Sequence, residues 1–558
     1  MRPNFPLLAT SALISLLATP ALGMEQVVVP PTDPNIQYLG RWDFTDSMTP
    51  NCGWQGSGFR VRFEGTGVRA TLDSIWLNES FRVVVDGNVL QSTKFVVTPG
   101  PALYTLADGL SDGVHSVELI KETYEGVNVE FHGLESEGTG LLQPSPPARR
   151  RIEFYGDSNL AGSSLGHEQD NSAVQFIGNL YGYAAITARM FDAEYQNISW
   201  SGSTISGVNA RFDRIDWFSA TPAWDFASNP ADLVVVNVGA NNVGQQVSSI
   251  KAQYHAFLDA LRGAHPSAHI VLFNAYGWDF NEPANYTHEV VAERNDPNMS
   301  VAIFPWVFEQ FHGCEYDHGG MAAALADHIT KTLGWGAAPN DVMSGFGVGG
   351  DVANGSFEES APFGGYGWRY FTDAGVSRIE DGAAAHDGSW FLRLSNGAAT
   401  HQPNPADPGD LVEATIWLRG ESRGEEASLT IDFRNQQLYT APMATFSQTV
   451  ILTSQWLPYT IRAVAPFDTP QPVFHTRLTI GSGTNDAVLV DLISQSITSG
   501  SAADLNGDGI VNGADLANLL AVWGPCAIDC LAACQADFND DCFVNGADLA
   551  QLLANWSN

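Results

Sequence analysis

The apolar residues of this chain change their spacing at Arg151, and the change separates regions of different fold class. Before it, apolar and polar residues nearly alternate in 58–72 (GFRVRFEGTGVRATL) and 80–90 (SFRVVVDGNVL), and Gly and Asp separate such runs. That rhythm predicts an antiparallel β-sandwich. After it, buried-strand segments such as 232–239 (DLVVVNVG) are followed by helical segments such as 248–264. This alternation predicts a parallel sheet with helices on both faces.

The chain has 558 residues, which is too many for one hydrophobic core, so several domains are expected. The patterns divide it into an export signal at 1–23, a β-sandwich at 24–142, a three-layer α/β domain at 150–338, a second β-sandwich at 345–498 and a small helical unit at 502–558.

The first 23 residues have the features of an export signal. Arg2 precedes an apolar run from Leu7 to Leu17, and small residues near Gly23 suit a cleavage site. The run is too short to span a bilayer, and no later segment is long and apolar enough. We therefore expect a secreted, extracytoplasmic protein without a transmembrane segment.

The formal net charge is −36, and the whole chain contains four lysines. Such a field repels polyanions, so the composition argues against a nucleic-acid partner. An uncharged substrate and a divalent cation are both compatible with it.

Four positions of the α/β region carry a pattern typical of hydrolytic chemistry. Ser158 lies in GDSN directly after a predicted strand, and Asn241 lies in GANN at the end of another. Gly202 lies in NISWSGST, and His318 comes just before the last predicted helix of the region. A serine nucleophile needs a base and needs donors aimed at the oxyanion. Since chemistry in such folds sits at the carboxyl ends of the strands, these residues predict a serine hydrolase.

In this chain order the four positions resemble the blocks of the SGNH hydrolases. A closer resemblance, over roughly residues 36–335, is to carbohydrate esterase family 2, on YLGRW (38–42), FEGTGV (63–68), GYAAITAR (182–189) and DAEYQNISWSG (192–202). It implies an N-terminal jelly roll followed by an SGNH domain. It also implies removal of acetyl groups from polysaccharides such as xylan and glucomannan, with no cofactor for catalysis.

The resemblance implies a role for each residue. Ser158 would attack the acetyl carbonyl, and His318 would act as its base. The backbone N–H groups of Ser158 and Gly202 and the amide of Asn241 would form the oxyanion hole. Glu315 stands three residues before His318, where these hydrolases usually have an aspartate. Two arrangements stay open: a triad with Glu315, or a dyad whose imidazole is oriented by a backbone carbonyl.

Two aromatic residues near these blocks, Trp200 and Trp278, are candidate substrate-binding positions. Sugar rings stack on aromatic faces, although ordinary packing is the alternative for each ring.

The second sandwich region resembles the galactose-binding-like carbohydrate-binding modules, on NGSFEE (354–359) and the closing VLVDLI (488–493). In that group an early Glu and a late Asp often hold a structural calcium, and Glu358 and Asp491 would correspond to them. An inert spacer is the alternative.

The segment 503–523 recurs at 536–556, with 15 of 21 positions identical. Each copy has oxygen-bearing side chains at the spacing of a calcium loop. The copies resemble dockerin repeats, which implies a cohesin-like or cell-surface partner. The expected calcium ligands are Asp504, Asn506, Asp508, Asn512 and Asp515 in the first loop, and Asp537, Asn539, Asp541, Asn545 and Asp548 in the second.

The sequence thus predicts a secreted carboxylic ester hydrolase that deacetylates polysaccharides through an acetyl-enzyme intermediate. One alternative is a catalytically inactive carbohydrate-binding or scaffold protein that keeps the fold. The other is an SGNH lipase or thioesterase.

Overall fold

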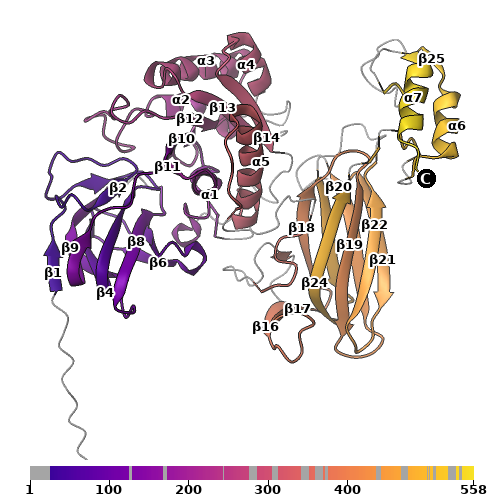
Figure 1. Cartoon of the computed structure of the whole chain (residues 1–558), viewed down its shortest axis with the longest axis horizontal. Helices are drawn as coiled ribbons and strands as arrows, with labels where there is room; N and C mark the ends of the chain where they lie inside the picture. The colour runs from indigo at the N-terminus through magenta and orange to yellow at the C-terminus, as the bar shows by residue number, and fades with distance from the viewer. Residues whose placement is uncertain are drawn as a thin grey trace, which may run out of the picture.

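The computed structural model in Figure 1 describes most of the chain. The described residues are 26–124, 128–166, 173–242, 244–275, 286–304, 312–340, 351–358, 368–370, 375–434, 442–466, 475–498, 500–501, 503–506, 510–525, 536–538 and 543–557. The predicted export signal and Trp278 lie outside them.

The first domain is an antiparallel sheet of nine strands with the order β1-β9-β4-β8-β5-β6 and further pairings of β2, β3 and β7. Burial alternates along the long central strand β4, which packs Phe59, Val61 and Phe63 into the core. The alternation read from 58–72 is therefore real, and it gives the sheet one buried face. The strands are β1 (Gln26–Val29), β2 (Gln37–Leu39), β3 (Asn51–Cys52), β4 (Gly58–Ser74), β5 (Glu79–Val85), β6 (Thr93–Val97), β7 (Ala102–Ala107), β8 (Gly113–Lys121) and β9 (Val129–Leu142).

The second domain is a five-stranded parallel sheet with the order β11-β10-β12-β13-β14. Alternate residues of β12 enter two separate cores, Leu233 and Val235 on one face and Val234 and Val236 on the other. Both faces are therefore covered, as the sequence predicts. The elements are β10 (Arg150–Gly156), α1 (Tyr183–Met190), β11 (Ala193–Ser199), α2 (Ile205–Asn209), β12 (Leu233–Asn237), α3 (Val247–Ala264), β13 (His269–Ala275), α4 (Thr287–Arg294), β14 (Met299–Phe304) and α5 (Glu315–Leu333).

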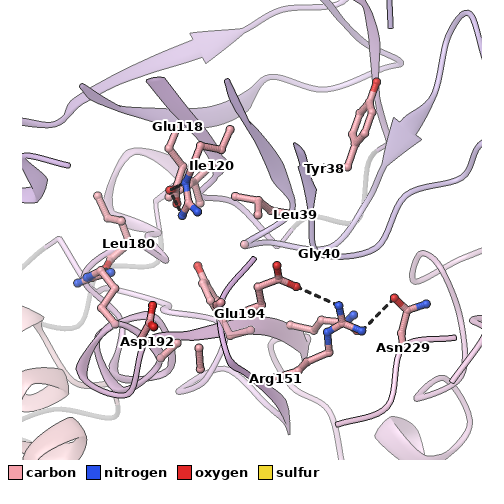
Figure 2. Close-up of a pocket in the computed structure, with 18 of the residues that line it drawn as sticks. Tyr38, Leu39, Gly40, Glu118, Ile120, Arg151, Leu180, Asp192, Glu194 and Asn229 are labelled. Carbon is pink, nitrogen blue, oxygen red and sulfur yellow. Dashed lines mark hydrogen bonds and ion pairs between the residues drawn. The ribbon is translucent and has the colours of Figure 1, made fainter. Parts of the chain in front are cut away.

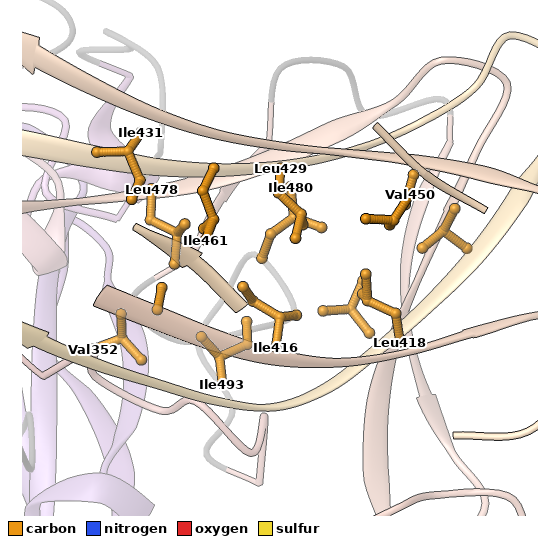
Figure 3. Packing of buried hydrophobic residues seen from close by; sticks show 14 of the residues in the cluster. Val352, Ile416, Leu418, Leu429, Ile431, Val450, Ile461, Leu478, Ile480 and Ile493 are labelled. Atoms are coloured by element: carbon orange, nitrogen blue, oxygen red, sulfur yellow. The ribbon is translucent and has the colours of Figure 1, made fainter. Parts of the chain in front are cut away.

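Two antiparallel five-stranded sheets follow, with the orders β15-β18-β23-β20-β21 and β16-β17-β24-β19-β22. Aliphatic side chains of both sheets, among them Ile416, Leu429 and Ile480, meet in one core between them (Figure 3). The strands are β15 (Arg369–Tyr370), β16 (Val376–Glu380), β17 (Trp390–Ser395), β18 (Ala399–Pro405), β19 (Leu411–Gly420), β20 (Glu426–Arg434), β21 (Ala444–Ile451), β22 (Leu457–Val464), β23 (His475–Ser482) and β24 (Ala487–Thr498).

The repeated C-terminal segments form two short helices, α6 (Gly513–Ala521) and α7 (Gly546–Ala554), beside a small sheet of β25 (Gly524–Pro525) and β26 (Phe543–Val544). Leu519 and its repeat counterpart Leu552 are fully buried between the copies. The duplication therefore builds one shared core.

Within the part of the chain that the structure describes, no helix is both long enough and apolar enough to cross a membrane.

Candidate active site

Three of the predicted site residues come together because their strands are neighbours. Ser158 follows β10, Gly202 follows β11, and Asn241 follows β12, and β10 lies between the other two. All three strands are parallel, so these residues lie at the same edge of the sheet.

Ser158 is held in a tight turn at the end of β10. A Cβ at Gly156 would lie 2.5 Å from the carbonyl oxygen of Asn237, so only glycine allows the strand to approach β12 here. The carbonyl oxygen of Ser158 accepts a hydrogen bond from the Ser163 N–H at 3.0 Å. The Ser158 side chain is 6% exposed, and within the described residues no hydrogen bond joins its hydroxyl to His318.

Asp157, which precedes the serine, is fully buried, and it connects the end of β10 to that of β12. Its own N–H donates to Asn237 O at 3.3 Å. Burial raises the pKa of its carboxyl to about 7, against hydrogen bonds from the backbone N–H groups of Asn159, Gly239 and Ala240. No role was predicted for Asp157 from the sequence, although its position in GDSN, directly before Ser158, could have indicated one. It fixes the segment that carries Asn241 relative to Ser158.

The predicted oxyanion donors are also drawn together. Gly202 has a φ of +78°, is exposed, and would bring a Cβ near no other atom. The conformation favours glycine and leaves its backbone accessible to a ligand. The Asn241 amide nitrogen donates to Ser203 O at 3.0 Å, which ties the two segments to each other. Asn242 is buried and accepts the Ile205 N–H, so its role is structural.

His318 lies in the first turn of α5 and is fully buried. Its Nδ1 accepts the backbone N–H of Tyr183 at 3.2 Å, and its Nε2 is buried without a hydrogen-bond partner in the described structure. Burial, together with the neighbouring His312, lowers the pKa of this imidazole to about 3. The ring is therefore neutral in this position. A general base works best with a pKa near the operating pH, so burial makes His318 a weaker base here than an ordinary histidine. His312 was not singled out from the sequence, and nothing in its local pattern marks it.

Among the described residues, no hydrogen bond joins the Glu315 carboxylate to His318. The charged groups that act on its buried carboxyl are Arg82, Glu122 and Lys94, all from the first domain. Burial raises the pKa of Glu315 to about 7, and the two cations oppose that shift. His318 Nδ1 accepts the Tyr183 N–H, so in this structure neither Glu315 nor a backbone carbonyl accepts a hydrogen bond from that nitrogen.

Asp317, the other acid beside the histidine, points away from it, as expected for a neighbour in sequence. Its Oδ2 accepts the Cys314 N–H at 2.9 Å and closes a capping box at the start of α5. The acid therefore fixes where the helix begins.

Trp200 lies between Ser199 at the end of β11 and the Gly202 turn, and it is half-buried. Its ring stacks on Trp217 with centroids 4.6 Å apart. It also packs against a small cluster that contains Tyr124 and Ala161, and Ala161 comes three residues after Ser158. Its part in substrate binding stays a prediction.

A pocket of about 290 Å³ lies at the other end of the same strands (Figure 2). Arg151 and Glu194, near the starts of β10 and β11, line it together with Tyr38 and Leu39 of the first domain. Within this lining, Arg151 Nη2 and Glu194 Oε2 form an ion pair of 2.9 Å. Since Ser158 follows the opposite end of β10, this pocket is not the candidate active site.

The predicted calcium-loop residues are described in part, and Asp508, Asn539 and Asp541 lie outside the described residues. Asp515 and Asp548, the last ligand of each loop, are fully buried. Asp515 accepts the N–H of Asn506 at 3.0 Å and that of Asn512 at 2.8 Å. Asp548 accepts the N–H of Phe538 and that of Asn545, both at 2.8 Å. The last aspartate of each loop therefore makes equivalent contacts in the two copies, and Asp504 and Asp537 occupy corresponding positions in the sequence.

In the second sandwich, Glu358 and Asp491 hold a turn. Glu358 accepts the N–H of Ser389 at 2.7 Å and that of Trp390 at 2.8 Å. Asp491 accepts the N–H of His386 at 2.7 Å and that of Asp387 at 3.0 Å. The two carboxylates thus both bind the backbone of the segment 386–390. Their role as a calcium-holding pair stays a prediction.

Two family models match the first two domains. Residues 38–146 match the carbohydrate esterase 2 N-terminal model, and residues 154–304 match that of the GDSL-like lipase/acylhydrolase family. The chain thus contains a region similar to the carbohydrate esterase 2 N-terminal domain, followed by a region similar to GDSL-like hydrolases. Both models end before the second sandwich, so that sandwich and the C-terminal helices are additions to the pair.

Relatives cover the same region. The cellulase/esterase CelE of Acetivibrio thermocellus is 30% identical over 330 residues, 54% of this chain and 40% of that protein. An acetylxylan esterase/glucomannan deacetylase of Cellvibrio japonicus is 23% identical over 361 residues, 60% of this chain and 100% of that protein. The chain thus spans less than half the length of CelE.

Among solved structures, a family two carbohydrate esterase from Clostridium thermocellum in complex with cellohexaose is 28% identical, with a TM-score of 0.50. The similarity covers 54% of this chain and 99% of that one. The chain is therefore homologous to family 2 esterases across both of its first two domains.

Proposed function

We propose that this chain is a secreted serine esterase that removes O-acetyl groups from neutral polysaccharides of the xylan or glucomannan type. The observation that carries the proposal is the meeting of Ser158, Gly202 and Asn241 at three neighbouring strand ends in a chain that matches both family models. The acetylxylan esterase/glucomannan deacetylase relative supports the substrate class.

The reaction uses two half-steps. The Ser158 hydroxyl oxygen attacks the acetyl carbonyl while His318 takes the hydroxyl proton, and the sugar oxygen leaves with that proton. Water then attacks the acetyl-enzyme, His318 takes one of its protons, and acetate departs as Ser158 is protonated again. The N–H groups of Ser158 and Gly202 and the Asn241 amide stabilise the oxyanion in both half-steps.

His318 must turn before the first half-step. Its Nδ1 accepts the Tyr183 N–H, so the neutral ring carries its proton on Nε2. A base needs an unprotonated nitrogen facing the serine. We propose that substrate binding releases the ring from Tyr183, in a dyad that does not use Glu315 as its acid. Catalytic hydrogen bonds are often loose before substrate binds, and the partnerless Nε2 leaves the ring free on that side.

The C-terminal additions would hold the enzyme at its substrate or at a surface. The second sandwich is proposed as a carbohydrate-binding module, on its two-sheet architecture and the Glu358 and Asp491 turn. The repeats are proposed as dockerin-like calcium loops that bind a cohesin-like or cell-surface partner. Their equivalent loop contacts at Asp515 and Asp548 support that reading.

The deciding experiment is acetate release from acetylated xylan and acetylated glucomannan by the full chain, with Ser158→Ala as control. We expect release by the wild type and none by the variant. Glycan binding without acetate release would favour an inactive binding or scaffold protein. Hydrolysis of long-chain esters or thioesters, with acetylated glycans untouched, would favour a lipase or thioesterase.

A further inference from the structure

We infer that Trp76 of the first domain and Phe218 of the second form a shared platform that binds the neutral sugar chain beyond the acetylated residue. The inference rests on the proposed function, since the chain it binds is the polysaccharide that Ser158 deacetylates. It assigns part of the substrate-binding surface to the first domain.

The platform is a run of exposed rings that continues to the active site. Trp76 is 63% exposed and Phe218 is 56% exposed, with ring centroids 6.2 Å apart. Phe218 in turn contacts Trp200 edge to face at 5.7 Å. Trp200 lies two residues before Gly202 and packs against the cluster that contains Ala161 of the Ser158 turn. The rings therefore lead from the surface to the proposed oxyanion donors.

Two side chains hold the segments of the platform together. Ile75 N–H donates to Asn128 O at 3.2 Å, and the Asn128 amide donates to Asp216 Oδ2 at 3.2 Å. Asp216 is buried, and its other oxygen accepts the Phe218 N–H at 2.7 Å and the Ser219 N–H at 2.6 Å. Hydrogen bonds thus run from the Trp76 loop to the Phe218 loop across the domain boundary. The backbone segments that carry the two rings are therefore connected before a ligand arrives, which lowers the cost of binding.

Gly53 lies so close to Asn128 and Asp216 that no side chain fits at its position. A Cβ at Gly53 would lie 2.7 Å from Asn128 Oδ1 and 2.7 Å from Asp216 Cβ. Any side chain there would push the two residues apart. The glycine therefore permits the close approach of the two domains.

The chemistry of the platform fits an uncharged sugar chain. The segment 75–78 reads IWLN and the segment 217–224 reads WFSATPAW, and neither contains an ionisable side chain. Two cations lie beside the second segment: Arg214 Nη1 donates to the carbonyl oxygens of Trp217 and Phe218, and the Arg211 guanidinium lies over the Trp217 ring. The exposed rings of Trp76 and Phe218 themselves suit the C–H faces of sugar rings. Large exposed apolar groups clustered in this way mark a binding surface. A lipid surface is the competing occupant, but the run of rings leading to Trp200 favours a chain that enters the active site.

The test compares a polymer with a small ester. Trp76→Ala and Phe218→Ala should each lower the ratio of kcat/KM for acetylated glucomannan to kcat/KM for 4-nitrophenyl acetate. We expect a fall of about tenfold, mainly through KM, because truncated aromatic anchors commonly cost a binding surface that much. Trp523→Ala is the matched control, since that tryptophan is 48% exposed in the C-terminal unit and should keep the wild-type ratio.

A binding measurement separates this inference from the proposed function. In a Ser158→Ala background, Trp76→Ala should weaken the binding of cellohexaose or xylohexaose. If the wild type releases no acetate from any glycan but this loss of affinity is seen, the platform stands and the deacetylase proposal falls. Ratios and affinities equal to those of the Trp523→Ala control would overturn the platform. The platform would also be overturned if Trp76→Ala left the ratio of the two kcat/KM values unchanged but abolished binding to phosphatidylcholine vesicles. That outcome would assign the patch to lipid.

Discussion

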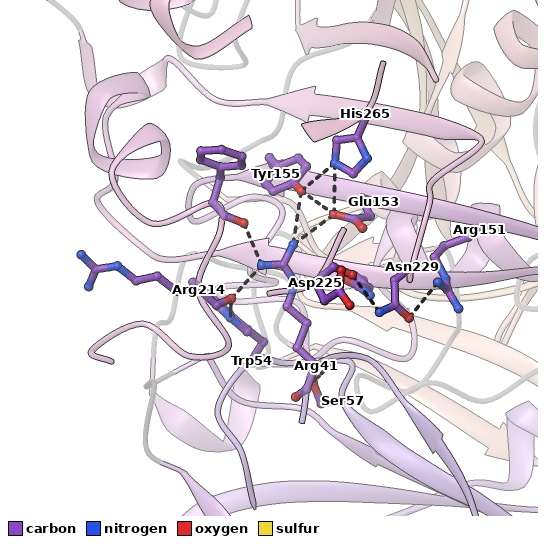
Figure 4. Close-up of polar contacts among 12 residues, drawn as sticks. Arg41, Trp54, Ser57, Arg151, Glu153, Tyr155, Arg214, Asp225, Asn229 and His265 are labelled. Carbon is purple, nitrogen blue, oxygen red and sulfur yellow. Dashed lines mark hydrogen bonds and ion pairs between the residues drawn. The ribbon is translucent and has the colours of Figure 1, made fainter. Parts of the chain in front are cut away.

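Arg41 Nη2 lies 3.0 Å from Glu153 Oε2, and both side chains are fully buried where the first two domains meet (Figure 4). Arg41 Nη1 donates to the carbonyl oxygens of Phe212 and Arg214, both at 2.7 Å, and its Nε donates to Gln196 at 2.7 Å. The guanidinium is therefore paired on all sides. Glu153 lies in β10, five residues before Ser158, so the contact joins the first domain to the strand that carries the nucleophile.

Arg41→Ala should destabilise the protein strongly, because it leaves Glu153 buried without its cation. Removing one partner of a buried ion pair typically costs about 3–5 kcal/mol. We expect that loss in the free energy of unfolding, measured by urea denaturation. Lys331→Ala is the control, since its pair with Asp327 is on the surface and such pairs contribute about 0–1 kcal/mol. Equal losses of unfolding free energy in Arg41→Ala and Lys331→Ala would show that the buried ion pair stabilises the protein no more than the surface pair.

Asn241→Ala should lower kcat without a comparable change in KM. Loss of one oxyanion-hole donor typically costs about 100- to 1000-fold in kcat. The neighbouring Asn242→Ala is the comparison, because its amide binds Ile205 and Gln253 within the fold. That variant should lose more thermal stability and less activity. If Asn241→Ala keeps wild-type kcat on 4-nitrophenyl acetate, the amide is not an oxyanion donor.

His318→Ala should lower kcat by about 100- to 10 000-fold, the range that general-base catalysis contributes. Glu315→Gln should lose far less than the roughly 10⁴-fold that removal of a triad aspartate causes, since its neighbours are Arg82, Glu122 and Lys94. Rates of acetyl ester hydrolysis for both variants decide between dyad and triad. His312→Gln serves as the control, and a larger loss there than in His318→Ala would move the role of base to His312.

The sequence was sufficient to predict the positions of those site residues that are determined by the local pattern of strands. Ser158 and Asn241 were expected at the carboxyl ends of strands of one parallel sheet, so their position at the same edge could be predicted. The strand β11 that brings Gly202 to this edge was not expected. The environment of Glu315 could not be predicted from the sequence, because it depends on how the first domain packs on the start of α5. Arg41 in YLGRW looks like an ordinary surface cation, and only the domain contact buries it. Trp76 and Phe218 are distant in sequence, and only the contact between their domains brings them together.

Glu315 should also make stability depend on pH. Its pKa is about 7 in the fold against 4.5 for an ordinary glutamate, because burial disfavours the charged form. Between those values the folded state holds a proton that the unfolded state has lost. Stability is therefore fully present below pH 4.5 and falls by up to about 1.4 kcal/mol per pH unit as the pH rises through 7.

Glu315→Gln isolates this effect from those of the other buried groups. The difference in free energy of unfolding between the variant and the wild type should favour the variant at pH 8 and shrink toward pH 4.5. Urea denaturation at several pH values measures it. A difference that stays constant with pH would mean that Glu315 titrates normally.

Removal of calcium should unfold the C-terminal repeats and leave the rest of the protein folded. Asp515 and Asp548 are buried carboxylates, and burying charge is costly unless it is compensated. A cation in each loop would supply that compensation.

A chelator should therefore reduce far-ultraviolet helical ellipticity and expose the repeats to protease. Added calcium should restore both, while esterase activity on 4-nitrophenyl acetate persists throughout. Asp504→Ala should reduce the calcium response, and Asp259→Ala, at an exposed carboxylate on α3, should keep it. Spectra that do not respond to chelator would rule out calcium as the element that orders these loops.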